Sequence, residues 1–272
     1  FRFVNHPVRL RTPLIRYNGH FTEATSDEAY DYIVANLTRI KEEHGGQAVA
    51  GITSARCTNE ENYLMQKFMR AVMGNNNIDC CARVCHSPTA YGMQQSFGTG
   101  AATNSIEDLA HTACILVIGA NPTEGHPVTG SKIKQRAMKG VPLIIVDPRE
   151  IELVPYAKYH LQLRPGTNVA LLNMMARFIL DAGLVDRDFV AKRCENWAEF
   201  ETGLRSLDLD ELERVTGVDR ELARAAALEY AGAEAAMSFH GLGVTEHNQG
   251  AKTVMLIANL AMMTGNVGRP GV

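Results

Sequence analysis

A thiol stands directly before an imidazole in the segment CCARVCHSP, residues 80–88. A cysteine thiolate is a soft ligand for transition metals, and an imidazole titrates near neutral pH and can accept a proton. Cys85 is therefore a candidate metal ligand, and His86 is a candidate proton acceptor beside it. The competing interpretation makes Cys85 a small buried apolar residue, which is the common role of an isolated cysteine.

The spacing of the cysteines argues against a metal site built from thiols alone. The pattern C-C-x-x-x-C lacks the C-x-x-C pairs of zinc sites and matches no iron–sulfur motif. A single thiolate can still complete the coordination of a metal whose other ligands belong to a cofactor. We interpret the remaining cysteines as structural, and most remaining histidines, including His240, as surface or core residues. His126 is singled out because it follows a loop of small polar residues.

Apolar runs alternate regularly with helical patterns in the second part of the chain. The runs CILVIGA (114–120), VPLIIVD (141–147) and AAMSFHG (235–241) predict strands. Helices are predicted for 126–139, 167–183 and 248–264, and residues 185–232 read as polar helices. Strands without polar alternation are typical of parallel sheets that are buried on both faces. The predicted fold class is α/β, with a Rossmann-like, doubly wound parallel sheet.

The first part of the chain predicts a smaller α/β piece. The pairs Thr25 with Glu28 and Thr58 with Glu61 are capping-box signals before two helical patterns, and glycines end both patterns. A strand is expected near AVAGIT, residues 48–53. We therefore predict two domains: residues 1–80, a partial α/β domain leading to the active-site turn, and residues 81–272, the Rossmann-like domain.

Loops that follow parallel strands line one edge of a sheet, where ligands usually bind. Four such loops here are rich in small and polar residues: 119–126, 147–149, 164–168 and 241–243. Glycines let the backbone approach a phosphate, a helix beginning at Thr167 offers unpaired amides, and Asp147 can accept ribose hydroxyls. The chain lacks G-x-G-x-x-G, so a dinucleotide-like cofactor other than a nicotinamide is favoured.

Composition excludes several classes of protein. The 272 residues are 46% hydrophobic and 21% charged, with a formal net charge of −3, so no nucleic-acid partner is expected. The apolar runs are too short for direct membrane insertion. Cysteine usage favours a reducing compartment, and we expect a cytoplasmic location. Because the chain starts at Phe1 and stops after a turn-like segment, we also expect an internal fragment that is inactive alone.

The motif CCARVCHSP, with TNEENYLMQKFMRAVMG before it and GTGAATNSIEDLAHTACILVIGANPTEGHPV after it, resembles one enzyme family. The resemblance is to the catalytic (alpha) subunit of molybdenum- or tungsten-dependent formate dehydrogenases, in the molybdopterin oxidoreductase superfamily. It implies that Cys85 ligates the metal, which two molybdopterin guanine dinucleotides also hold. It further implies that His86 helps remove the hydrogen of formate.

The same resemblance assigns residues of the polar loops to the guanine nucleotide. The implied cofactor-binding residues are Gly119, Asn121, Glu124, Gly125, Asp147, Arg149, Gly166, Thr167, Asn168, Leu242 and Glu246. Relatives more often carry Asp and Ser at the positions of Glu124 and Gly125, and Gln at that of Glu246.

The resemblance also implies partners and rivals. Formate would be oxidised to carbon dioxide, with a [4Fe-4S] cluster whose ligands lie outside this chain and with iron–sulfur or NAD-reducing subunits as electron acceptors. The alternatives are a nitrate reductase, a non-catalytic paralogue from NADH dehydrogenase, and an NAD-binding dehydrogenase. The Cys85-His86 pair argues against the first two, and the missing glycine fingerprint argues against the third.

Overall fold

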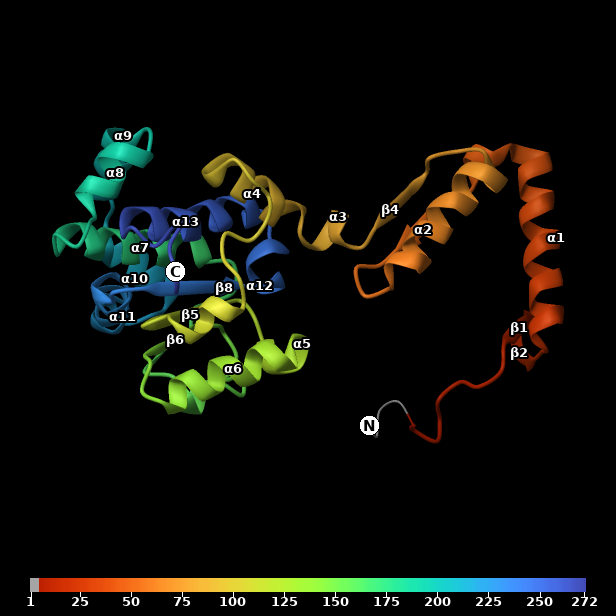
Figure 1. Ribbon diagram of the computed structural model, residues 1–272, viewed down its shortest axis with the longest axis horizontal. Coiled ribbons are helices and arrows are strands. Elements are labelled where there is room, and N and C mark those ends of the chain that lie inside the picture. Colours follow the sequence, from red (N-terminus) through yellow and green to blue (C-terminus); the bar gives the residue numbers. More distant parts are fainter. Residues whose placement is uncertain (1–4) are drawn as a thin grey trace. The chain divides into compact units, whose positions relative to one another are not determined.

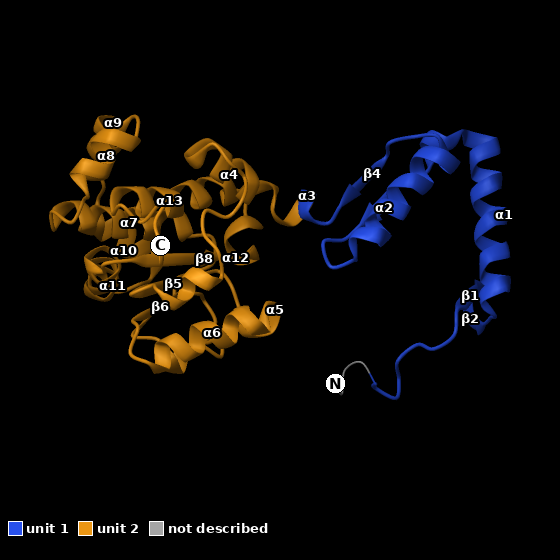
Figure 2. Ribbon diagram, in the orientation of Figure 1, with its two compact units in different colours: residues 1–83 blue, residues 84–272 orange. Residues whose placement is uncertain are grey.

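A computed structural model describes residues 5–272 of the chain, and these form two compact units (Figures 1 and 2). Unit 1 ends at Arg83, and unit 2 runs from Val84 to Val272. The assignment of two domains with separate roles stays a prediction. No helix among the described residues is long and apolar enough to cross a membrane.

Unit 1 contains two small sheets and two longer helices. Strands β1 (Leu14–Tyr17) and β2 (His20–Glu23) form an antiparallel hairpin. Strands β3 (Gly51–Thr53) and β4 (Ile78–Cys80) pair in parallel. The helices are α1 (Ser26–His44) and α2 (Asn59–Phe68), and a π-helical turn, Met69–Met73, continues α2.

Both predicted capping boxes are present. The Thr25 hydroxyl accepts a hydrogen bond from the Glu28 amide, and the Glu28 carboxylate accepts one from the Thr25 amide at 2.7 Å. Thr58 and Glu61 repeat the arrangement at the start of α2. Neither helix contains a buried residue, so their end signals, and not burial, specify them.

Unit 2 is built on one parallel sheet with the strand order β7-β6-β5-β8. Its strands are β5 (Cys114–Ile118), β6 (Leu143–Val146), β7 (Tyr159–Leu161) and β8 (Ala236–His240). Every residue of β5 and β6 is buried, as expected for strands covered on both faces. The predicted α/β fold class with a parallel sheet is confirmed.

Helices cover both faces of this sheet (Figure 1). Leu116 and Ile144 face a core shared with α7, α11 and α13, whereas Ile115 and Ile145 face a core shared with α6. The helices of unit 2 are α4 (Ser87–Phe97), α5 (Pro122–Gly125), α6 (Pro127–Met138), α7 (Asn168–Asp181), α8 (Arg187–Arg193), α9 (Trp197–Arg205), α10 (Leu209–Thr216), α11 (Arg220–Gly232), α12 (Leu242–Thr245) and α13 (Gly250–Met263). A short helix, α3 (Ala82–Cys85), contains the boundary between the units.

The segment directly after His86 is helical. Residues 87–97 form α4, which begins with a proline in its first turn and ends at Gly98 in the left-handed conformation. Helix α4 packs along α13 (Figure 1). The packing is close at Gly92, where an added Cβ would lie 2.8 Å from both the Ala251 carbonyl oxygen and the Val254 Cβ.

We expect Gly92→Ala to destabilise unit 2, because backbone as well as side-chain atoms of α13 would have to move. Overpacking of this kind costs about 1–3 kcal/mol. Gly203→Ala is the matched control, because Gly203 lies within α9 and a Cβ there meets nothing within 4 Å. It should stabilise the protein by roughly 0.5–1 kcal/mol. Urea unfolding measures both changes, and equal stability of the two variants would contradict this account.

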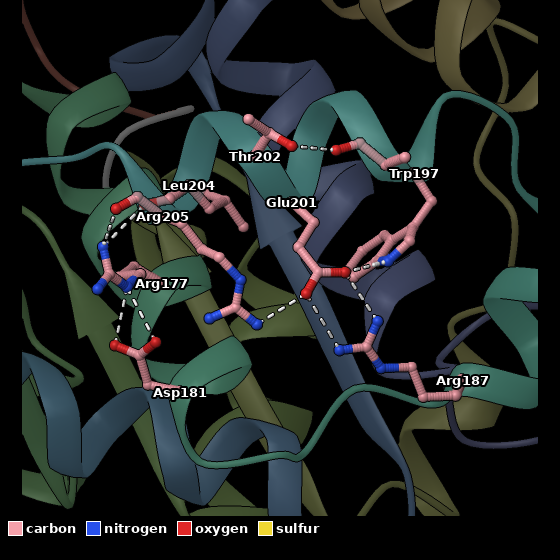
Figure 3. A network of polar contacts seen from close by, with 9 residues as sticks. Arg177, Asp181, Arg187, Trp197, Glu201, Thr202, Leu204 and Arg205 are labelled. Atoms are coloured by element: carbon pink, nitrogen blue, oxygen red, sulfur yellow. Dashed lines mark hydrogen bonds and ion pairs between the residues drawn. The ribbon is translucent and has the colours of Figure 1, made fainter.

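Glu201 ties α8 to α9 through one carboxylate (Figure 3). It accepts from the guanidinium groups of Arg187, at 2.9 Å, and Arg205, at 2.7 Å, and from the Trp197 indole at 2.7 Å. The bonds from Arg187 and then Arg205 lower the pKa of Glu201 to about 2. Beside this group, the Arg177 side chain of α7 donates to the carbonyl of Leu204 and so holds the end of α9.

The lowered pKa predicts how the stability of unit 2 depends on pH. A carboxylate whose pKa falls on folding stabilises fully above its ordinary value of 4.5, and this stabilisation disappears as the pH falls through about 2. Glu201→Gln should therefore lower the melting temperature at pH 7, and its difference from wild type should vanish toward pH 2. Glu199→Gln, on an exposed side chain of the same helix, is the control. A difference that stays constant between pH 7 and pH 2 would refute the assignment.

Candidate functional site

Cys85 and His86 occupy the junction of two helices. Cys85 is the last residue of α3, and His86 directly precedes α4. The cysteine is half-buried, whereas the histidine is exposed. The Thr245 hydroxyl, at the end of α12, donates to the Cys85 carbonyl at 2.6 Å. The segment that follows β8 therefore holds the backbone of the candidate metal ligand.

A second contact joins the same junction to β8. The Thr89 hydroxyl lies 3.2 Å from Nδ1 of His86 and 3.1 Å from Nε2 of His240, the last residue of β8. Burial, with a smaller contribution from positive charge on His86, lowers the pKa of His240 to about 4. His240 is therefore neutral at physiological pH, and its ring acts as a hydrogen-bonding group.

The six cysteines are all free thiols, in agreement with the absence of a predicted disulfide framework. Cys114 is buried in the sheet, and burial raises its pKa to about 12, so its thiol is inert. No cluster of three or more His, Cys, Asp or Glu side chains suited to a metal occurs in residues 5–272. That a cofactor supplies the other ligands of a metal at Cys85 stays a prediction.

The loops after β5 and β8 meet closely. The Gly243 amide donates to the Gly119 carbonyl at 2.9 Å. Gly119 has φ +56°, and a Cβ on it would lie 2.7 Å from the carbonyl carbon of Gly243. Only glycine satisfies both the left-handed backbone and this approach. The α12 segment, which carries Thr245, is thereby placed at the carboxyl end of the sheet.

The loops after β6 and β7 adjoin each other at the same edge of the sheet. Asp147 is 4% exposed and accepts from the Arg149 amide at 2.9 Å, and the Arg149 guanidinium lies 3.7 Å from the same oxygen. The ring of His160, on β7, lies 2.9 Å from the Asp147 carbonyl oxygen. A buried carboxylate with one strong amide partner retains capacity to accept hydroxyl groups.

The turn before α7 completes the edge. Gly166 and Thr167 lead into the helix, the Thr167 hydroxyl donates to the Arg164 carbonyl at 2.7 Å, and the buried Asn168 amide reaches the Gly243 carbonyl at 3.4 Å. The loops after β5, β8 and β7 are thus linked, directly or through α7, as the sequence predicts.

The remaining predicted residues lie on these loops and are mostly exposed. Asn121 precedes α5, and its side-chain oxygen accepts from the Thr123 hydroxyl at 2.9 Å. Glu124 and Gly125 lie in α5, Leu242 begins α12 with 43% exposure, and Glu246 follows α12. The structure brings these residues to one edge of the sheet, and their role in binding a ligand stays a prediction.

No side chain caps the helices that start at this edge, α6, α7 and α13, within the part of the chain that the structure describes. In α13 the first amide, that of Gly250, donates to the His247 carbonyl at 2.9 Å. Side chains cap α8, α10 and α11, which start elsewhere, and both long helices of unit 1, whereas α9 also has no side-chain cap. Open amides at a helix start attract anions, phosphate in particular.

A separate hollow of about 480 Å³ lies in unit 1, where the end of β3, strand β4 and helix α2 line it. Its lining includes Ser54, Asn62, Tyr63 and Asp79, and it contains none of the predicted site residues.

Sequence reasoning missed three residues near Cys85. The contact between Thr89 and His240 spans 151 positions of the chain, and the contact between Thr245 and Cys85 spans 160. No local sequence pattern indicates contacts between residues so far apart. The one available signal was the position of His240 at a predicted strand end, directly before a glycine-rich loop.

Two comparisons by sequence point in one direction. The molybdopterin oxidoreductase family model matches residues 9–271. The chain is 41% identical over 269 residues to the F420-dependent formate dehydrogenase 1 subunit alpha of Methanococcus maripaludis, covering 99% of this chain and 39% of that protein. It is 42% identical over 265 residues to formate dehydrogenase H of Escherichia coli, covering 96% and 37% respectively.

A comparison by structure supports the fold. Acetylene hydratase from Pelobacter acetylenicus superposes with a TM-score of 0.79 at 23% identity, covering 99% of this chain and 37% of that one. This chain thus spans well under half the length of the relatives that it matches. The family model nevertheless matches nearly every residue, and the chain belongs to the molybdopterin oxidoreductase family.

Proposed function

We propose that this chain is part of the catalytic subunit of a formate dehydrogenase. The observation that carries the proposal is the junction of Cys85 and His86, a half-buried thiol beside an exposed imidazole. The Thr245 hydroxyl holds this junction at the carboxyl edge of the sheet. The relatives named formate dehydrogenase support the substrate, at 41% and 42% identity.

The thiol fits a metal that a cofactor also binds. Cys85 offers one soft sulfur ligand, and the described residues provide no cluster of further ligands around it. A molybdenum or tungsten ion held by the dithiolenes of two molybdopterin guanine dinucleotides would need one such ligand. When bound, the metal accepts two electrons from the substrate.

The carboxyl edge of the sheet fits a guanine dinucleotide. The close glycine contact between Gly119 and Gly243 leaves backbone without side chains there, and the uncapped start of α7 presents amides suited to phosphate. Asp147 is placed to accept ribose or base donors. The proposed cofactor-binding set is Gly119, Asn121, Glu124, Gly125, Asp147, Arg149, Gly166, Thr167, Asn168, Leu242 and Glu246.

The proposed reaction converts formate to carbon dioxide, one proton and two electrons. His86 accepts the proton on a ring nitrogen, and its exposure gives that proton a path to solvent. We expect the ligands of the [4Fe-4S] cluster that would carry the electrons to lie outside this chain, and the acceptor to be an iron–sulfur or NAD-reducing subunit. The six free thiols support a reducing, cytoplasmic location.

The experiment that tests the proposal uses the full-length protein, purified without oxygen. We expect molybdenum or tungsten, guanine nucleotide released on denaturation, and reduction of a redox dye that depends on formate. Protein without metal would favour the non-catalytic paralogue, and nitrate-dependent dye oxidation without formate activity would favour a nitrate reductase.

Replacement of the candidate ligand gives a sharper prediction. Cys85→Ser should reduce formate-dependent dye reduction to background, because a hydroxyl is a poor, hard substitute for a thiolate at this metal. Cys57→Ser is the control, because Cys57 is an exposed thiol of unit 1. Activity measured beside metal content distinguishes loss of metal from loss of turnover. Wild-type activity in Cys85→Ser would end the proposal.

A further inference from the structure

Three side chains form a continuous chain of contacts at the Cys85 junction. Nδ1 of His86 lies 3.2 Å from the Thr89 hydroxyl, and that hydroxyl lies 3.1 Å from Nε2 of His240. Thr89 lies in the first turn of α4, and His240 ends β8. The chain therefore links an exposed ring to the sheet of unit 2.

The two inner members are better anchored than the outer one. Thr89 and His240 are half-buried, whereas His86 is exposed. His240 pairs in register with Ile118 of the fully buried strand β5. An exposed imidazole would otherwise sample several rotamers and both tautomers, so a fixed hydroxyl at Nδ1 restricts its orientation.

The hydroxyl also restricts where the protons lie. The Thr89 hydroxyl has one proton to donate. If it donates that proton to one of the two histidines, two arrangements of hydrogen-bond donors are possible. In the first, Nδ1–H of His86 donates to Thr89, and the Thr89 hydroxyl donates to Nε2 of His240. In the second, every donor is reversed, and Nε2 of His86 carries the proton. Only the first leaves a bare nitrogen on His86 that can accept a proton.

His240 serves this chain as a neutral anchor and not as a proton store. Its pKa, lowered to about 4 by burial, keeps it uncharged at pH 7. The neutral ring of His240 can therefore keep its hydrogen bond to Thr89 at this pH.

We propose that Thr89 and His240 are positioning residues that hold the ring of His86 in one orientation and one tautomer. This inference rests on the proposed function for the importance of that ring. The contacts themselves are independent of the substrate.

The test uses the full-length protein and two readouts. Nitrogen spectra of labelled histidine in the metal-free protein report the His86 tautomer, and steady-state kinetics of the loaded protein report kcat and KM for formate. Wild type should show one predominant tautomer of His86. Thr89→Val should give a mixture of the two tautomers, and should lower kcat roughly 100-fold with little change in KM.

Two further variants separate positioning from packing. Thr89→Ser keeps the hydroxyl and should retain both the tautomer and kcat. His240→Phe keeps a ring but removes the nitrogen, and should shift both readouts in the direction of Thr89→Val. Thr253→Val is the matched control, because its buried hydroxyl donates to the Gln249 carbonyl at the start of α13, at 3.1 Å.

An unchanged His86 tautomer in both Thr89→Val and His240→Phe would overturn the inference, even in a protein that oxidises formate. A protein that binds no metal and ignores formate would overturn the proposed function, and the tautomer measurement would still decide the positioning contact.

Discussion

The site depends on one close approach, between the loops that follow β5 and β8. The hydrogen bond from Gly243 to the Gly119 carbonyl, at 2.9 Å, brings backbone to backbone where no side chain fits. This approach places α12, and α12 places Thr245 against the Cys85 carbonyl. The sheet thereby fixes the junction of α3 and α4 that carries the Cys85 thiol, although this junction lies far from β8 in the sequence.

The helices of the two units are stabilised in different ways. In unit 2 the strands are buried on both faces, and the helices share two continuous cores with them. In unit 1 the helices α1 and α2 begin at complete capping boxes yet bury none of their residues. End signals stabilise such helices by about 1 kcal/mol each, whereas burial contributes about 25 cal/mol for each Å² of apolar surface. Unit 2 therefore supplies the rigid frame for the junction at Cys85.

Local signals account for what the sequence predicted correctly. Thr25 and Thr58 mark the starts of α1 and α2, and the uninterrupted apolar run at 114–118 marks β5. These signals can be read from the local sequence alone. The three-residue strand β7 (Tyr159–Leu161) lacks such a signal, and α4 has only Pro88 in its first turn and Gly98 after its end. Strand β7 is stabilised by its pairing with β6. Helix α4 is stabilised by close packing of its Gly92 against α13. Likewise Cys85 and His86 are adjacent in the sequence, whereas the contact of Thr89 with His240 exists only after folding.

The positions of the helix caps also bear on anion binding at the edge of the sheet. A side chain that caps a helix occupies the amides that a phosphate would bind, so capping and anion binding compete for the same donors. Helices α8, α10 and α11 use Asp186, Asp208 and Asp219 as caps, and a carboxylate there would also repel an anion. Helix α7 follows the strand ends and begins at Thr167, whose hydroxyl turns back to the Arg164 carbonyl and leaves the amides open. The Asp caps thus lie on helices other than α7, whose first amides remain available to an anion.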